Sequence, residues 1–376
     1  MLKTSIDELT LVLQATIKDK LNLEKNDDWQ KMANIIIAKF EKKADLKNVF
    51  GERSEAQKCP EGYTRGYLYG SHNFYFCVAY NFANYNMGII CKFSAQALAY
   101  YLKVKNTQVY KFLQSLECDK YQFRLSRCDV DVDFMNESFT PTKIFDDLKT
   151  KKVLVYYQKK QKNKFIFVRK NARLQGVAIN QEVPTCYVGA VSSECQLRIY
   201  DKKREQIERN GSKLDFVLKY DSVVRFEIAL KHDLAHNLTD MLLKVNDEKQ
   251  LNDLILSVFL QKFYFKRART DKATIYTKKM KQALKSDQSY LLGHVNGDND
   301  LLRRMQYLLF ESGTISTLFK IYAIWGYSDL DEAINYIKEF VQTWNVNDDC
   351  HYWLAKHAND TAETFTSFTD LKEQLK

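Results

Sequence analysis

The sequence predicts an α+β fold, in which lobes of antiparallel sheet with flanking helices form one domain and a mainly helical region follows. Three observations predict it. Runs of alternating apolar and polar residues, rich in aromatic and β-branched side chains, recur through the first two thirds of the 376 residues. Short polar connections such as 70–73 join several runs, which favours antiparallel hairpins. Beyond about residue 245 the strand pattern fades and helical periodicity takes over.

The first lobe contains both kinds of element. Residues 5–14 alternate as a strand does, and 27–43 form a helix in which Trp29, Met32 and Phe40 recur at helical spacing. Residues 63–93 alternate aromatic and polar side chains and are interrupted twice, which predicts three antiparallel strands. Helices are expected at 95–103 and 107–117.

The second lobe repeats this rhythm of strand, helix and strand, which a duplicated lobe would explain. A helix is expected after Pro141, because proline is favoured at the first helical position. The strands expected here are 121–134, the hairpin 152–158 and 164–170, the pair 185–191 and 195–202, and 222–231; the helices are 141–150 and 232–244.

The chain is expected to divide near residue 245, into a domain at 1–244 and a mainly helical region at 245–376. Helices are predicted at 248–268, 276–287, 299–323, 329–345 and 361–375. With 3 prolines and 12 glycines in the whole chain, no proline-rich or glycine-rich linker separates the two parts.

Composition narrows the class of partner. The net charge of +10 favours a polyanion over an acidic protein. The 8 cysteines are scattered, with neither a Cys-x-x-Cys pair nor the spacing of a zinc site. No signal peptide and no run long enough to cross a bilayer is visible. We therefore expect a protein of the reducing cytoplasm with free thiols and no membrane contact.

Three of the predicted strands carry an ordered polar face, because side chains alternate along a strand. The members that share a face are Arg127, Asp129, Asp131 and Asp133 in the first strand, Gln196, Arg198, Tyr200 and Lys202 in the second, and Arg225, Glu227 and Lys231 in the third. Carboxylates in a row repel one another unless a cation lies among them. That cation is either an arginine or a hard metal ion such as Mg²⁺ or Mn²⁺, and the pattern leaves both open.

Tyr200 is the candidate nucleophile. Arg198 and Lys202 flank it two residues away on each side, so they would lower the phenol pKa and hold an anionic phosphodiester. The alternative is an ordinary amphipathic strand with one solvated face.

Two basic stretches are candidates for contacts with DNA phosphates. The hairpin turn contributes Lys159, Lys160, Lys162 and Lys164, and the second stretch contributes Lys266, Arg267 and Arg269. A merely solvated charged face is the alternative for each stretch.

Taken together, these motifs resemble the rolling-circle replication initiation factor family, the Rep_trans type of plasmid Rep proteins and related conjugative-element relaxases. The order and spacing match over roughly 120–240. The segments that carry the resemblance are Arg127-Cys-Asp129 with Asp133, Thr185-Cys-Tyr-Val-Gly189, Arg198-Ile-Tyr-Asp-Lys202 with Glu205, and Arg225-Phe-Glu-Ile-Ala-Leu-Lys231 with Ala235. The opening Ile6-Asp7-Glu-Leu-Thr10 is similar to the family's first strand.

The resemblance implies an enzyme that nicks and rejoins one strand of origin DNA, in duplex and single-stranded form, through a 5′-phosphotyrosine intermediate. Tyr200 would be the nucleophile, with Tyr187 and Tyr220 as competitors. Asp129 and Glu227 would bind Mg²⁺ or Mn²⁺, with Asp133 or Asp131 as a third ligand. The cations Arg198, Lys202 and Arg225 would stabilise the phosphate charge.

The family also implies a homodimer and a partnership with a host DNA helicase. The region 245–376 would serve DNA binding or dimerisation. Two departures from the family pattern stand out, the acidic Asp131 where a small or apolar residue is usual and Ala190-Val-Ser-Ser193 where a basic residue is common. A conjugative relaxase and a catalytically inactive DNA-binding regulator of the same fold are the alternatives.

Overall fold

The computed structural model describes residues 1–16, 26–70, 75–161, 164–180, 182–285, 301–310 and 312–346, together with 350–351, 354, 358, 361–362 and 366–373. The chain forms two compact units. The first comprises Met1–Ala15 and Lys25–Val295, and the second comprises Thr16–Glu24 and Asn296–Lys376. Each is described by itself.

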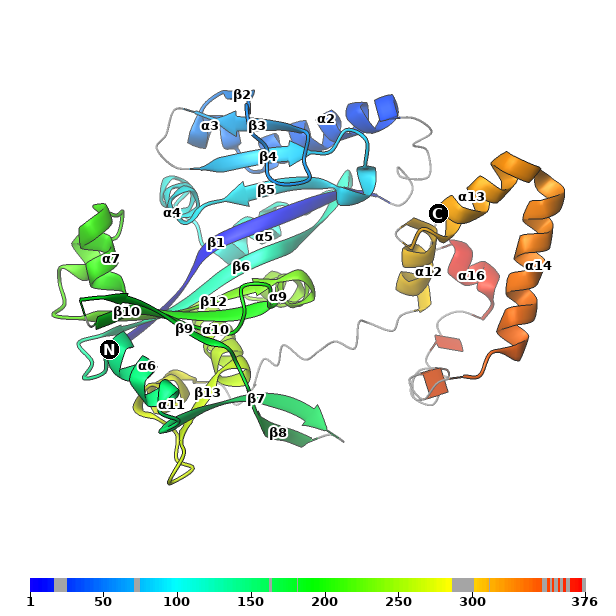
Figure 1. Ribbon diagram of the computed structural model, residues 1–376. Coiled ribbons are helices and arrows are strands. Elements are labelled where there is room, and N and C mark those ends of the chain that lie inside the picture. The colour runs from blue at the N-terminus through cyan, green and yellow to red at the C-terminus, as the bar shows by residue number, and fades with distance from the viewer. Residues whose placement is uncertain are drawn as a thin grey trace. The chain divides into compact units, whose positions relative to one another are not determined.

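A ten-stranded antiparallel sheet runs through the first unit (Figure 1). Its strands are β1 (Leu2–Ala15), β2 (Arg53–Glu55), β3 (Arg65–Tyr69), β4 (Phe76–Tyr80), β5 (Ile89–Phe93), β6 (Tyr121–Met135), β9 (Leu174–Ile179), β10 (Glu182–Val188), β11 (Cys195–Asp201) and β12 (Val223–Lys231). Their spatial order is β2-β3-β4-β5-β1-β6-β12-β11-β10-β9. The α+β fold expected from the sequence is confirmed.

This order divides into two matching halves at the antiparallel pair β1–β6. In the N-terminal half-sheet (β1 to β5), the chain leaves β1 through helices and returns strand by strand until β5 pairs with β1. The C-terminal half-sheet (β6, β9 to β12) does the same, and β12 pairs with β6. The strand order therefore has the twofold relation that a duplicated lobe would produce.

Helices connect or follow the strands of both half-sheets. Those of the first unit are α2 (Asn26–Lys43), α3 (Leu46–Phe50), the 3-10 turn η1 (Tyr85–Met87), α4 (Ala95–Val104), α5 (Val109–Ser115), α6 (Pro141–Lys149), α7 (Lys202–Arg209), α8 (Leu214–Val217), α9 (His232–Leu243), α10 (Glu248–Lys262) and α11 (Ile275–Ala283). Short polar side chains cap several of them: Ser94, Thr140 and Asp201 accept backbone N–H bonds at the starts of α4, α6 and α7.

Aromatic side chains fill the core on one face of each half-sheet. In the N-terminal half, the Phe93 ring of β5 packs against Phe76 of β4, with ring centroids 4.3 Å apart. In the C-terminal half, Phe226 of β12 lies 5.1 Å from Phe134 of β6 and 5.3 Å from Tyr276 of α11. Burial of these rings leaves the opposite face of β6, β11 and β12 for charged residues.

A second sheet of three strands is built from the hairpin β7 (Val153–Gln161) and β8 (Lys164–Arg169) with β13 (Tyr264–Arg267), in the order β13-β7-β8. The hairpin was predicted, but β13 falls in a stretch expected to be helical. Tyr264 and Phe265 are buried there, and Tyr264 pairs with Tyr156 of β7, so tertiary packing overrides the local helical pattern. The strand β9 and the helices α3, α7 and α8 were also not expected from the sequence.

The first unit extends past the boundary expected near residue 245. The reason lies in α10, where Leu254, Val258 and Phe259 are fully buried. Because a helix with this much buried surface cannot leave the core without exposing it, α10 and α11 belong with the sheet.

The second unit is helical in its described residues, with α12 (Leu301–Phe310), α13 (Thr314–Trp325), α14 (Tyr327–Thr343) and α16 (Phe368–Glu373). No residue of α13 or α14 is buried. Among the described residues, no helix combines the length and low polarity needed to cross a membrane.

Candidate active site

A polar cleft of about 610 Å³ lies over the charged face of the C-terminal half-sheet. Its floor comes from β6, β11 and β12, one wall from α7 and the residues after it, and another from β1, Tyr75 and the start of α4. The lining residues are Asp7, Glu8, Tyr75, Ser94, Ala95, Gln96, Arg127, Asp129, Thr185, Tyr187, Arg198, Tyr200, Lys202, Glu205, Gln206, Arg209, Gly211, Ser212, Lys213 and Glu227.

Tyr200 lies in the floor of this cleft, and 5% of the residue surface is exposed. Its hydroxyl donates to Glu227 Oε2 at 2.9 Å, and Lys202 Nζ donates to the same hydroxyl at 3.4 Å. The pairing of β11 with β12 brings these groups together, because Arg198 lies opposite Glu227 and Tyr200 lies opposite Arg225. The phenol, a carboxylate and an ammonium group therefore converge on one point.

The sequence predicts a lowered pKa for the Tyr200 phenol, and this prediction is wrong. Burial raises the pKa of Tyr200, the negative charge of Glu227 raises it further, and Arg225 and Arg198 offset only part of the rise. Lys202 responds to the same surroundings, because burial and the nearby Arg225 lower its pKa. A hydrogen-bonded, un-ionised phenol is the resting form.

Asp129 lies on β6 beside the Tyr200–Glu227 pair. Arg127 donates to both of its carboxylate oxygens at 2.8 and 2.7 Å, and it also lies 3.5 Å from Glu8. Burial raises the pKa of Asp129 to about 6, and the negative charges of Glu227 and Glu8 add to the rise against the opposing effect of Arg127. Three carboxylates thus repel one another at one end of the cleft floor.

A second charge cluster lies beneath the cleft and corrects two expectations. Arg225 is fully buried, donates to both oxygens of Asp133 at 2.7 Å, and lies 3.3 Å from Asp131 and 3.2 Å from Asp7. Arg225 does not line the cleft, so it is no contact for a substrate phosphate. Asp131 and Asp133 are likewise buried and ion-paired rather than solvated.

A β-bulge in β1 brings two acidic residues to the same side. The pairing of β1 with β6 shifts between Ile6 and Glu8, so Asp7 is the extra residue. Asp7 binds Lys213 at 2.7 Å as well as Arg225, while Glu8 lies opposite Asp129. Ordinary alternation would separate Asp7 from Glu8, which is why the strand period alone did not single them out.

A divalent cation fits the donor chemistry of one of these clusters only. Glu8, Asp129 and Glu227 offer oxygen ligands, and their mutual repulsion is what such a cation relieves. Asp131 and Asp133 do not fit, because Arg225 already neutralises them below the cleft. Among the described residues, no three potential ligands are gathered as closely as a bound metal requires. A cation would have to displace Arg127 from Asp129 and Arg198 from Glu227.

Comparison with known proteins gives the family. The family model for the replication initiation factor matches residues 123–322, more than half of the chain. The chain belongs to the replication initiation factor family.

A solved structure, that of a rolling circle replication initiator protein from Geobacillus stearothermophilus, has a similar fold. The TM-score is 0.50 and the sequence identity 18%, over 76% of this chain and 97% of that one. A comparison with curated proteins found no similar sequence. The family match begins at residue 123, near the start of β6, and so contains Asp129, Tyr200 and Glu227.

The two competing tyrosines of this family member are placed differently. Tyr187 lines the cleft from β10, opposite Arg198 in the strand register. Tyr220 is not among the cleft residues, and it packs against Met135, Val217 and Val223 instead. Of these two competitors, Tyr187 therefore stays a rival to Tyr200 on position.

The predicted DNA-contacting cations differ in their exposure and in their partners. Lys159, Arg267 and Arg269 are exposed, whereas Lys266 pairs with Asp271 at 2.8 Å and lies over the rings of Tyr156 and Phe167. Lys162 lies outside the described residues, and the backbone alone is described for Lys160 and Lys164. Lys266 is thus occupied within the second sheet.

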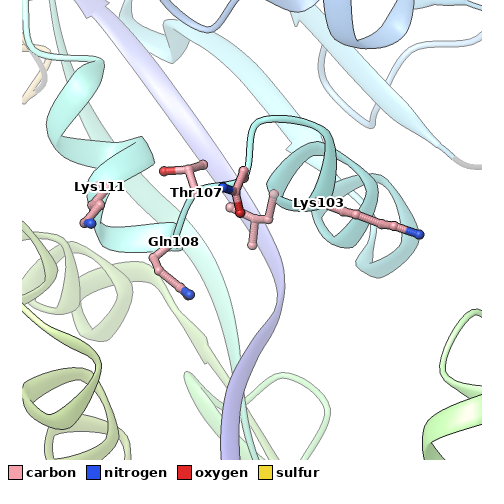
Figure 2. Close-up of a pocket in the computed structure, with 6 residues that line it drawn as sticks. Lys103, Thr107, Gln108 and Lys111 are labelled. Atoms are coloured by element: carbon pink, nitrogen blue, oxygen red, sulfur yellow. The ribbon is translucent and has the colours of Figure 1, made fainter.

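Another surface hollow, of about 460 Å³, lies at the connection between α4 and α5 (Figure 2). Its lining residues are Leu102, Lys103, Asn106, Thr107, Gln108 and Lys111. Figure 2 shows Lys103 and Lys111 pointing to opposite sides, and Gln108 donates to Glu248 at 2.7 Å. With neither a carboxylate nor an aromatic ring in its lining, this hollow offers no equivalent of the chemistry in the cleft.

Proposed function

We propose that this protein initiates rolling-circle replication of a plasmid by nicking and rejoining one strand at the origin. The observation that carries the proposal is the convergence of the Tyr200 hydroxyl with Glu227 and Lys202 on the floor of a cleft lined by arginines. Membership of the replication initiation factor family supports it, and so does a fold similar to that of a rolling circle initiator.

In the proposed step, the Tyr200 oxygen attacks the scissile phosphorus while the bond from phosphorus to the 3′ oxygen breaks. The phenol proton passes to Glu227, which already accepts it in a hydrogen bond at 2.9 Å. The 5′-phosphate becomes linked to Tyr200, and the leaving 3′ oxygen takes a proton from water to give the 3′-OH that serves as the primer. Attack of a 3′-OH on the phosphotyrosine reverses the step and rejoins the strand.

Positive charge in the cleft serves the phosphate. Arg198 and Lys202 flank the phenol, and Arg127, Arg209 and Lys213 line the same cleft. Such fixed cations stabilise the extra negative charge of the pentavalent transition state. Mg²⁺ or Mn²⁺ would be held by Asp129 and Glu227 with Glu8, where it would polarise the scissile phosphate.

The second unit is proposed to bind protein rather than DNA. Residues 296–376 contain 13 acidic and 7 basic residues, whereas residues 1–295 contain 34 acidic and 50 basic ones. An acidic surface repels a polyanion, and α13 and α14 expose Phe319, Trp325 and Phe340. A homodimer and a host helicase are the partners that we propose for this unit, in a cytoplasmic protein.

The test is nicking of supercoiled DNA that carries the origin, in the presence of Mn²⁺ or Mg²⁺. Wild type should leave a covalent protein–DNA adduct whose linked peptide contains Tyr200, and Tyr200→Phe should leave none. An adduct on Tyr187 would move the nucleophile to β10. No adduct on the true origin with either metal would reject the nicking function.

One observation favours a second candidate, an inactive DNA-binding regulator of the same fold. All three proposed metal-binding carboxylates are paired with arginines, Asp129 and Glu8 with Arg127 and Glu227 with Arg198. If these pairs persist with Mn²⁺ present, origin binding would occur without an adduct. A relaxase of a conjugative element shares the proposed chemistry, and transfer of a DNA that carries the origin between cells would distinguish it.

A further inference from the structure

One wall of the cleft comes from the N-terminal half-sheet, outside the residues that match the family model. Tyr75, Ser94, Ala95 and Gln96 line this wall, just before β4 and at the start of α4. Every other lining residue except Asp7 and Glu8 lies at or beyond Arg127. The two halves of the sheet therefore build one cleft between them.

Tyr75 is the exposed aromatic residue of this wall. Its residue surface is 39% exposed, in contrast to the buried Tyr200 in the floor. Its backbone is fixed, because the Ser94 N–H donates to the Tyr75 carbonyl at 3.0 Å and Ser94 Oγ caps α4 at Ala97. Lys92 Nζ lies 5.9 Å from the ring centroid. The Tyr75 ring is thus presented to solvent from a hydrogen-bonded backbone, beside a cation.

The chemistry around the ring selects its ligand. The cleft holds Arg127, Arg198, Arg209 and Lys213, which suit phosphates, but an aromatic face does not bind phosphate. A nucleobase offers the flat π surface that stacks on tyrosine, and only an unpaired base leaves that surface free. The wall therefore suits a single strand better than a duplex.

We propose that Tyr75 stacks on an unpaired base next to the scissile phosphate and so positions the strand over Tyr200. This inference rests on the proposed nicking function. It assigns to the N-terminal half-sheet a substrate-positioning role, while the reacting groups stay in the C-terminal half-sheet.

The experiment compares DNA binding by full-length variants in a Tyr200→Phe background, which forms no adduct. The probes are a labelled oligo(dT) of about 12 nucleotides, within the usual range of single-strand site sizes, and a duplex of equal length. Tyr75→Ala should weaken oligo(dT) binding about tenfold, the usual effect of one lost stack, and leave duplex binding unchanged. Tyr75→Phe keeps the ring and should bind as the parent does.

The matched control is Phe82→Ala, which removes a ring-bearing residue that is 41% exposed in the turn after β4 but absent from the cleft lining. It should not change oligo(dT) binding. Photocrosslinking with 5-iodouracil in the oligonucleotide should label a peptide containing Tyr75. Equal affinity of the Tyr75→Ala and Phe82→Ala variants, or crosslinks only to other peptides, would overturn the proposal.

Failure of this inference and failure of the proposed function give different results. If wild type forms the Tyr200 adduct while Tyr75→Ala binds oligo(dT) normally, only the stacking role is wrong. If no adduct forms on origin DNA, the nicking function fails whatever the binding data show. Equal melting temperatures of Tyr75→Ala and the parent would exclude misfolding as the cause of weak binding.

Discussion

The two half-sheets have the same strand order but carry different residues on the corresponding faces. In the C-terminal half, the face of β6, β11 and β12 opposite the aromatic core holds Asp129, Arg198, Tyr200 and Glu227. In the N-terminal half, β4 and β5 occupy the places of β11 and β12 in the order, and β4 is entirely buried. Figure 1 shows β1 and β6 side by side between the halves.

Sheet topology alone therefore does not make this site, because both half-sheets have the same strand order. The reactive groups lie where polar residues occupy every second position of three neighbouring strands. The N-terminal half supplies Tyr75 and the carboxylates of β1 at the border instead. Five predictions test or refine this contrast, in order of decreasing effect.

The largest effect is expected at Tyr200, and the buried Tyr80 on the corresponding strand of the other half-sheet is its control. Tyr200→Phe should reduce adduct formation by a factor on the order of 10³ or more, because the attacking oxygen is gone. Tyr80 of β4 is fully buried, and its hydroxyl has no hydrogen-bond partner among the described residues. Tyr80→Phe should therefore keep full activity. A gel assay for the covalent adduct measures both, and equal loss in the two variants would contradict the contrast.

The next effect concerns the buried cation under the C-terminal face. Arg225→Met should lower the free energy of unfolding by about 3–5 kcal/mol, because Asp131 and Asp133 lose their counter-charge while buried. Urea denaturation measures the change. Adding Asp133→Asn should recover part of the loss, and a single variant as stable as wild type would show that Arg225 is not the structural partner.

The third prediction concerns which carboxylates of the charged face of β6 and β12 bind a metal ion. Asp129→Asn and Glu227→Gln should each weaken Mn²⁺ binding by a factor on the order of 10–100, whereas Asp133→Asn should change it little. Calorimetric titration of Mn²⁺ into each variant distinguishes them. A strong effect of Asp133→Asn would instead place the cation near Arg225.

The pH dependence of stability reports the buried face directly. Burial raises the pKa of Asp131 from 3.8 to about 7, and the charge of Asp133 adds to the rise against Arg225. Between pH 4 and pH 7, Asp131 therefore holds a proton in the folded state that it has released in the unfolded state. The contribution of Asp131 to the free energy of unfolding falls as the pH rises through this range. Relative to Asp131→Asn, wild type should lose stability over this window. Parallel pH profiles of thermal unfolding would contradict the prediction.

The smallest effect is expected at the second sheet, which has no counterpart in the N-terminal half. Replacing Arg267 and Arg269 by alanine should reduce the salt dependence of duplex binding by about one phosphate contact each. Lys266→Ala should not, because Lys266 is paired with Asp271 and covers two rings. Fluorescence anisotropy at several salt concentrations measures the slopes. Loss of slope in Lys266→Ala would show that this lysine leaves its partners to bind DNA.

Local pattern in the sequence determined much of this protein. The period of two placed Arg198, Tyr200 and Glu227 on polar faces, and helix periodicity located α2, α6 and α9, because both patterns repeat within a few residues. Only the tertiary structure decided the β-bulge at Asp7, the burial of Arg225, the strand β13 and the wall at Tyr75. Each of these depends on a partner more than one hundred residues away in the chain or on the cover over a face, and no local pattern records such contacts.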